Sequence, residues 1–153
     1  MTLEECKLAT IEHINTVRKY IRFFTDKLTD RGEKHDASKL TDAELPYFAE
    51  HTDNLNKIEY GSDEYKAELE ALMPALEHHY AENSHHPEHW PNGISDMSLW
   101  DITEMLCDWK ASTKRQKSGN ILKSIDLNAE RFKIDPQLKQ ILINTAKLME
   151  DYE

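Results

Sequence analysis

Apolar residues recur every three or four positions along most of the chain, which is the spacing of amphipathic helices. In the first segment, Thr2 and Glu5 have the spacing of a capping box. Apolar positions then continue from Leu3 to about residue 29, and Gly32 follows shortly afterwards. The pattern therefore predicts a helix that begins at the start of the chain and breaks at Gly32.

Two further helices are predicted before residue 83. Thr41 and Glu44 repeat the capping-box spacing and should open a short helix that ends at about His51. Ser62 is placed to cap the next helix. Pro74 lies inside that helix and should kink it, because proline removes a backbone N–H donor.

The second half of the chain has one irregular segment followed by three helices. Residues 83–96 contain two prolines and a glycine, which predicts a loop. Helical spacing returns over residues 98–113 and, more weakly, over residues 120–132. Asp135-Pro136 then combines a cap with a first-turn proline, which is typical of a helix start.

The elements together predict an all-α fold. No strand-like alternation appears, and the chain has only 4 glycines and 5 prolines. We expect an irregular bundle of about six helices that forms a single domain over residues 1–153. Its last helices, over residues 120–151, follow the part that carries the chemically interesting residues, at about 11–113.

Charge and composition exclude several classes of partner. A formal net charge of −10 argues against binding to a nucleic-acid polymer, although a small phosphorylated substrate remains compatible with it. No apolar run approaches the roughly 18 residues of a membrane span. The 2 cysteines are too few for a disulfide framework. We therefore expect a cytoplasmic protein without a membrane partner, and its oligomeric state stays open.

Histidines are concentrated in the middle of the chain, where seven of the eight lie between residues 35 and 89. His79 shares a helix face with apolar residues and is expected to point inward, whereas His78 is turned away. A single inward histidine is most often a core residue. If the helix continues, His86 lies on the same side as His79; if it stops, spacing does not separate His85 from His86.

Acidic residues accompany the histidines on a later helix. Asp108 stands between Cys107 and Trp109, where an uncompensated carboxylate is costly, so we expect it to have a cationic partner. Asp101 and Glu104 share its flank of the helix, and we interpret them as part of a solvated acidic stripe.

The order of these residues resembles that of the HD-domain metal-dependent phosphohydrolases, an all-α superfamily. The resemblance is carried by His13 with residues 14–17, by His35-Asp36 with the trailing Lys39, by His79 and His85-His86, and by residues 104–108, which end at Asp108. A closer resemblance, carried by His78-His79, His85-His86, Trp90, Glu104-Met105 and Asp108-Trp109, is to a small uncharacterised family common in bacteria and their phages. The Gly-Tyr-Pro signature of the cyclic-dinucleotide phosphodiesterases is absent, so hydrolysis of cyclic di-GMP is not implied.

The resemblance implies one or two divalent ions in a single site. Its metal ligands would be His13, His35, Asp36, His79, His86 and Asp108. Mixed imidazole and carboxylate ligands favour Mn, Fe, Co, Ni or Zn over Ca or Mg. Lys39 would contact a substrate phosphate, His85 is our candidate to protonate the leaving group, with His89 and Glu82 as alternatives, and Trp90 and His89 would contact the substrate.

The leading hypothesis is a metal-dependent phosphohydrolase in which metal-bound hydroxide attacks a small phosphomonoester or diester, such as a nucleotide. Two alternatives stay open. An acidic helical protein could bind a partner and use metal only to stabilise its fold, or an HD-type di-iron oxygenase could use the same histidines.

Overall fold

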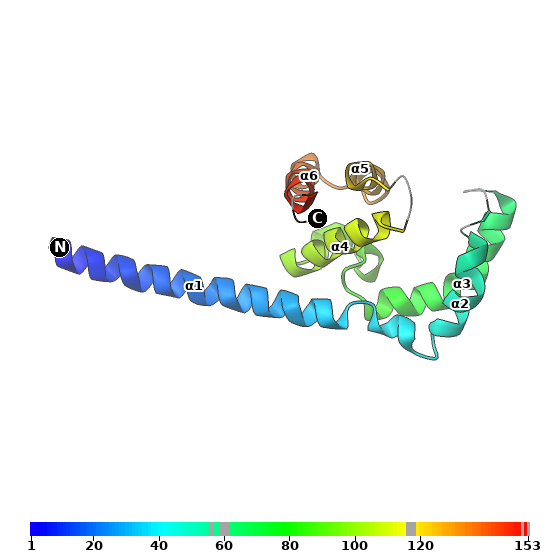
Figure 1. The fold of residues 1–153 in the computed structure, drawn as a ribbon, viewed down its shortest axis with the longest axis horizontal. Helices are drawn as coiled ribbons and strands as arrows, with labels where there is room; N and C mark the ends of the chain where they lie inside the picture. The colour runs from blue at the N-terminus through cyan, green and yellow to red at the C-terminus, as the bar shows by residue number, and fades with distance from the viewer. Residues whose placement is uncertain (56, 59–61, 116–118, 151, 153) are drawn as a thin grey trace. The chain divides into compact units, whose positions relative to one another are not determined.

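The computed structural model describes residues 1–55, 57–58, 62–115, 119–150 and 152. Over these residues the chain forms helices and no strand, which confirms the predicted all-α class (Figure 1). The α-helices are α1 (Leu3–Lys34), α2 (Leu45–Leu55), α3 (Asp63–Glu82), α4 (Leu99–Thr113), α5 (Ile121–Arg131) and α6 (Pro136–Glu150). Three short 3-10 helices complete the described fold: η1 (Ala37–Leu40), η2 (Pro87–His89) and η3 (Gly93–Asp96).

The chain divides into two compact units, Met1–Lys34 and His35–Glu153. The first unit consists of α1, and a lone helix cannot enclose a core. The division therefore does not decide whether residues 1–153 form a single domain, which stays a prediction. The second unit contains all the remaining helices and a core of its own.

Helix α1 begins as predicted and ends later than predicted. The Glu5 backbone N–H donates to Thr2 Oγ1, and the Thr2 N–H donates to a Glu5 carboxylate oxygen, which is the reciprocal capping box. The helix continues through Gly32 to Lys34, so the predicted break at Gly32 is wrong. One glycine costs a helix only about 1 kcal/mol, and the basic residues Arg31 and Lys34 favour its final turn.

Helix α2 does not begin with the predicted capping box. It starts at Leu45, and the Thr41 hydroxyl donates backwards to the Ser38 carbonyl over 2.7 Å. Glu44, the supposed partner of Thr41, points instead at two histidines of α3. Thr41 and Glu44 have the spacing of a capping box, but the Glu44 carboxylate contacts His78 and His79 of α3 instead of capping α2.

Helix α3 follows the sequence pattern closely. The Ser62 hydroxyl caps it by accepting the Tyr65 backbone N–H over 3.1 Å, and the helix ends at Glu82. It bends along its length (Figure 1), and Pro74 inside the helix explains the bend because it has no N–H to donate. The last turn carries His79, which is buried, as the helical periodicity predicted.

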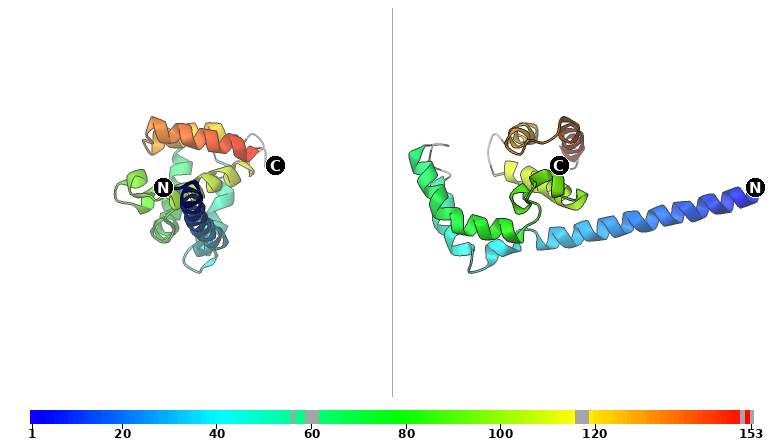
Figure 2. Two further views of the ribbon diagram at one scale, coloured as in Figure 1. Left: turned by 90° about the vertical axis from the view of Figure 1, so that its left-hand side faces the viewer. Right: turned by 180° about the vertical axis from the view of Figure 1, so that it is seen from behind.

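Helices α4, α5 and α6 lie together and enclose the main hydrophobic core (Figure 2). Each starts where predicted: Ser98 forms a capping box with Asp101, Asn120 caps α5, and Asp135 accepts the Gln137 N–H in front of α6. The buried apolar residues are Leu106, Ile121, Ile125, Ala129, Ile134, Leu142 and Ala146. Among the described residues, no helix has an apolar stretch long enough to cross a bilayer.

We expect Ile125→Ala to destabilise the protein by about 2–5 kcal/mol, because Ile125 is fully buried in this core and its loss leaves a cavity. Denaturant unfolding followed by circular dichroism measures the change. Leu127 lies on the same helix with 60% of its surface exposed, and Leu127→Ala should change stability by no more than about 0.5 kcal/mol. Equal losses in the two variants would contradict this assignment of the core.

Candidate metal centre

The His35-Asp36 doublet lies directly before η1. Asp36 has a left-handed backbone with φ of 53°, a conformation that aspartate tolerates better than most residues. Its carbonyl accepts the Lys39 backbone N–H, and one of its carboxylate oxygens, Oδ2, accepts the Lys39 ammonium over 2.6 Å. The other oxygen, Oδ1, faces His79 and His85, whereas His35 lies nearer to Oδ2.

His85 and His86 lie in the loop after α3, and Ser84 fixes that loop. The Ser84 hydroxyl donates to Asp101 Oδ1 over 2.6 Å, and the Ser84 carbonyl accepts the Trp90 indole N–H over 2.8 Å. Asp101 is only 3% exposed and also caps α4, so the predicted solvated role of Asp101 is wrong. A buried carboxylate thus ties the histidine loop to the start of α4.

Four side chains converge on one point. Asp36, His79, His85 and His86 each offer one ligand atom, and these atoms all lie within 4.8 Å of one another. Asp36 Oδ1 is 3.3 Å from His79 Nε2 and 3.5 Å from His85 Nε2, and His79 Nε2 is 3.0 Å from His86 Nε2. The sequence left His85 and His86 undecided; the fold brings both into the cluster.

A second group of possible ligands adjoins the first. It consists of His35, His85 and Asp108, again within 4.8 Å, and His35 Nε2 lies 3.7 Å from Asp108 Oδ1. His35 is thus a cationic partner for Asp108, as the sequence predicted. Because His85 belongs to both groups, its ring can serve an ion at only one of them at a time.

Two atoms at the centre are buried without a hydrogen-bond partner among the described residues: Asp36 Oδ1 and His85 Nε2. An unpaired buried oxygen or nitrogen is costly, and such groups are rare in folded proteins. Here one belongs to a carboxylate and the other is a ring nitrogen, and they face each other over 3.5 Å. A divalent cation satisfies both at once, so the donor set fits a transition metal.

Two glutamates that the sequence analysis did not assign to the centre surround the histidines. Glu44 is fully buried, and its two oxygens lie 2.7 Å from His78 Nδ1 and 2.9 Å from His79 Nδ1. Glu104 lies 2.9 Å from His35 Nδ1 and 3.1 Å from His85 Nδ1, so the interpretation of Glu104 as solvated is wrong as well. The sequence pattern predicts Glu44 to be the capping-box partner of Thr41, and no sequence signal indicates that it contacts the histidines.

The cluster shifts the protonation of its members in opposite directions. Hydrogen bonding to Asp108 and then to Glu104 raises the pKa of His35 to about 10. Burial, followed by repulsion from His85 and His79, lowers the pKa of His86 to about 3. Burial opposes ionisation of Asp36, but His79 and Lys39 outweigh it and hold its pKa well below the usual range.

The remaining predicted residues have varied positions. His13 lies on α1, in the first unit, and its role as a ligand stays a prediction. Trp90 and His89 anchor the loop: the indole binds the Ser84 carbonyl, and His89 Nδ1 donates to the Tyr80 carbonyl over 2.7 Å. Contacts of Trp90, His89 and Lys39 with a substrate also stay predictions.

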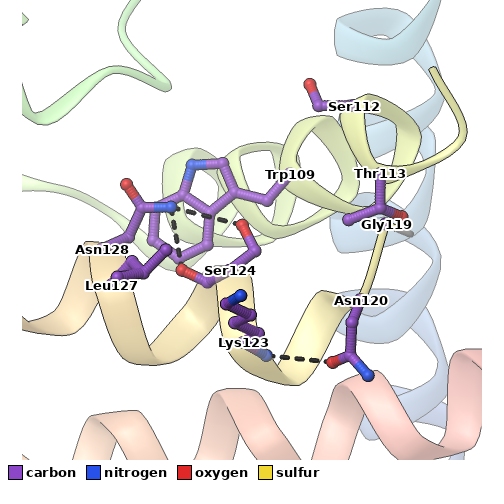
Figure 3. Close-up of a pocket in the computed structure, with 9 residues that line it drawn as sticks. All are labelled: Trp109, Ser112, Thr113, Gly119, Asn120, Lys123, Ser124, Leu127 and Asn128. Carbon is purple, nitrogen blue, oxygen red and sulfur yellow. Dashed lines mark hydrogen bonds between the residues drawn. The ribbon is translucent and has the colours of Figure 1, made fainter. Parts of the chain in front are cut away.

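A separate pocket of about 320 Å³ lies between α4 and α5 (Figure 3). The Trp109 ring borders it, together with small polar side chains and Lys123 (Figure 3). None of the lining residues belongs to either group of candidate ligands. The pocket is therefore a feature separate from the histidine cluster.

The described part of the chain is thus all-helical and has histidine–carboxylate groups that could hold a metal ion. The chain belongs to a family described only as a family of unknown function (DUF5662), whose model matches residues 2–148. No curated protein and no solved structure matches the chain significantly.

The raised pKa of His35 predicts how the stability of the metal-free protein depends on pH. Because the folded pKa of about 10 exceeds the ordinary value of 6.5, the ion pairs of His35 stabilise the fold fully below about pH 6.5 and are lost as the pH rises through 10. The difference in melting temperature between chelator-treated wild type and His35→Asn should therefore shrink over this range. A difference that grows with pH would contradict the assignment.

Proposed function

We propose that this protein is a metal-dependent phosphohydrolase that acts on a small phosphorylated substrate, with a nucleotide as the leading candidate. The observation that carries the proposal is a pair of buried atoms, Asp36 Oδ1 and His85 Nε2, that have no hydrogen-bond partner within the described ranges and belong to four convergent candidate ligands. The order of the HD-like motif supports the reaction class, and the acidic exterior favours a compact substrate over a polymer.

Asp36, His79, His85 and His86 would hold one ion, and His35 with Asp108 could contribute to a second. The balance of charge supports such an occupancy. Four carboxylates, from Asp36, Glu44, Glu104 and Asp108, belong to or surround the cluster, whereas Lys39 and the protonated His35 contribute two positive charges. Divalent cations would offset this excess of negative charge, which burial makes costly.

When bound, such an ion polarises a phosphoryl group and lowers the pKa of water towards about 7. The protein's own groups would orient the substrate. Lys39 is partly exposed, with its ammonium held on Asp36 Oδ2 beside the cluster, so it is well placed to contact a phosphate oxygen. Asp36 then serves the centre through Oδ1 and positions the lysine through Oδ2.

Metal removal should lower the melting temperature by several degrees, because the cluster then keeps buried negative charge without its cation. Differential scanning calorimetry before and after chelation, paired with elemental analysis, measures the effect. Re-addition of Mn, Fe, Co, Ni or Zn should restore the original transition. Confirmed loss of metal without any change in melting would contradict a centre coupled to folding.

Protein loaded with one of these metals should release phosphate or nucleoside from a panel of nucleotides. Asp36→Asn should reduce the rate by roughly 100-fold or more, because it removes the charge of the central ligand. Glu68→Gln is the matched control, since Glu68 binds His51 and Asn54 rather than the cluster, and it should retain activity.

If no member of the panel is hydrolysed by the metal-loaded protein, the phosphohydrolase proposal fails. Metal content then separates the remaining hypotheses. A bound metal without turnover favours a structural role for the ion, and a magnetically coupled iron pair favours oxygen chemistry.

A further inference from the structure

Two glutamates make the same contact with four histidines. Glu44 receives His78 and His79, and Glu104 receives His35 and His85, in each case through Nδ1 and over 2.7–3.1 Å. A carboxylate only accepts hydrogen bonds, so the ring nitrogen that faces it must be the donor. A neutral ring held in this way has its lone pair on Nε2, the nitrogen that a metal binds.

The Nε2 atoms of the held rings are the ones that converge. Those of His79 and His85 lie within 3.5 Å of Asp36 Oδ1, and that of His35 lies 3.5 Å from Asp36 Oδ2. The two candidate ligand groups contain four histidines, and three of them, His35, His79 and His85, have Nδ1 next to a glutamate oxygen. The fourth, His86, meets the ring of His79 at Nε2.

We propose that Glu44 and Glu104 are the positioning residues of the metal centre. Each fixes the tautomer and orientation of its histidines, and each adds a negative charge behind the ligands that strengthens their hold on the cation. This inference rests on the proposed metal site and goes beyond it, because neither glutamate offers an atom to the candidate ligand groups.

The burial of the glutamates supports a role beyond a surface ion pair. Glu44 is 0% exposed, and the Glu104 side chain is only 11% exposed. Burying a carboxylate is expensive unless its oxygens are satisfied. Ligand histidines are among the donors that satisfy both glutamates, and His78 and Ser38 also bind Glu44. The two glutamates also connect separate segments: Glu44 joins the start of α2 to α3, and Glu104 joins α4 to His35 and to the loop of His85.

The same kind of pair occurs away from the cluster, which provides a matched control. His51 Nδ1 lies 2.7 Å from Glu68 Oε2 and connects α2 to α3. Neither residue belongs to a candidate ligand group. A glutamate that only joins helices should behave like Glu68, whereas a positioning residue should affect the metal.

The test measures the affinity of the full-length wild type, Glu44→Gln, Glu104→Gln and Glu68→Gln for Zn²⁺ and Co²⁺ by competition with a chelator. In Glu44→Gln the amide can accept from one ring only and turns its N–H₂ towards the other, because His78 and His79 face different oxygens. In Glu104→Gln both rings still face Oε1, and the variant removes the negative charge behind His35 and His85. We expect both cluster variants to lose about 10–100-fold in affinity, with Glu68→Gln within about twofold of wild type. Saturating Co²⁺ should give an altered visible spectrum in the cluster variants alone.

The folded state is checked by circular dichroism of the metal-free variants. If Glu44→Gln does not fold, Glu104→Gln decides the question, since the Glu104 side chain is partly exposed whereas Glu44 is fully buried. Nitrogen-15 spectra of the zinc-loaded protein give a second measurement, in which His79 and His85 should carry their proton on Nδ1 in wild type.

Unchanged affinity and an unchanged Co²⁺ spectrum in a folded Glu104→Gln would overturn the inference and leave the metal site standing. Rings protonated on Nε2 in the zinc-loaded wild type would also overturn it. A wild type that binds neither ion is a different result, because it removes the proposed centre itself.

Discussion

The cluster depends on one electrostatic constraint: acidic groups and imidazoles are packed together where water cannot fully solvate them. Asp36 Oδ1 and His85 Nε2 face each other without a hydrogen-bond partner in the described part of the chain. Around them the protein compensates where it can. Lys39 neutralises the second oxygen of Asp36, and His35 keeps a proton between Glu104 and Asp108, with its pKa raised to about 10. The two atoms at the centre belong to groups that could hold a metal ion.

Helix α4 organises much of this arrangement from one flank. Asp101, Glu104 and Asp108 are spaced by three and four residues and therefore share a face. Asp101 holds the histidine loop through Ser84, Glu104 holds His35 and His85, and Asp108 approaches His35. Leu106 of the same helix belongs to the core formed with α5 and α6. The cluster is thus built on a helix whose position the core fixes, which is what a site of defined geometry requires.

Local signals in the sequence located the helices well and the polar contacts less well. The starts of α3, α4, α5 and α6 follow their capping residues. Glu44 shows the limit of such signals, since its spacing from Thr41 fitted a cap, yet the fold directs it to His78 and His79. Asp101 is a similar case: it does cap α4, but its other oxygen serves a loop 17 residues away. A pattern of spacing describes one helix and contains nothing about the segment that will pack against it.

By itself, the sequence determined the all-helical class, most helix boundaries and the set of residue types from which a metal centre could be assembled. Tertiary structure decided that both His85 and His86 join His79 and Asp36, and that two glutamates stand behind the histidines. The physical reason is range. Helix formation and capping act over three or four residues, whereas the contacts of the cluster join residues as far apart in the sequence as His35 and Asp108 and exist only after the helices have packed.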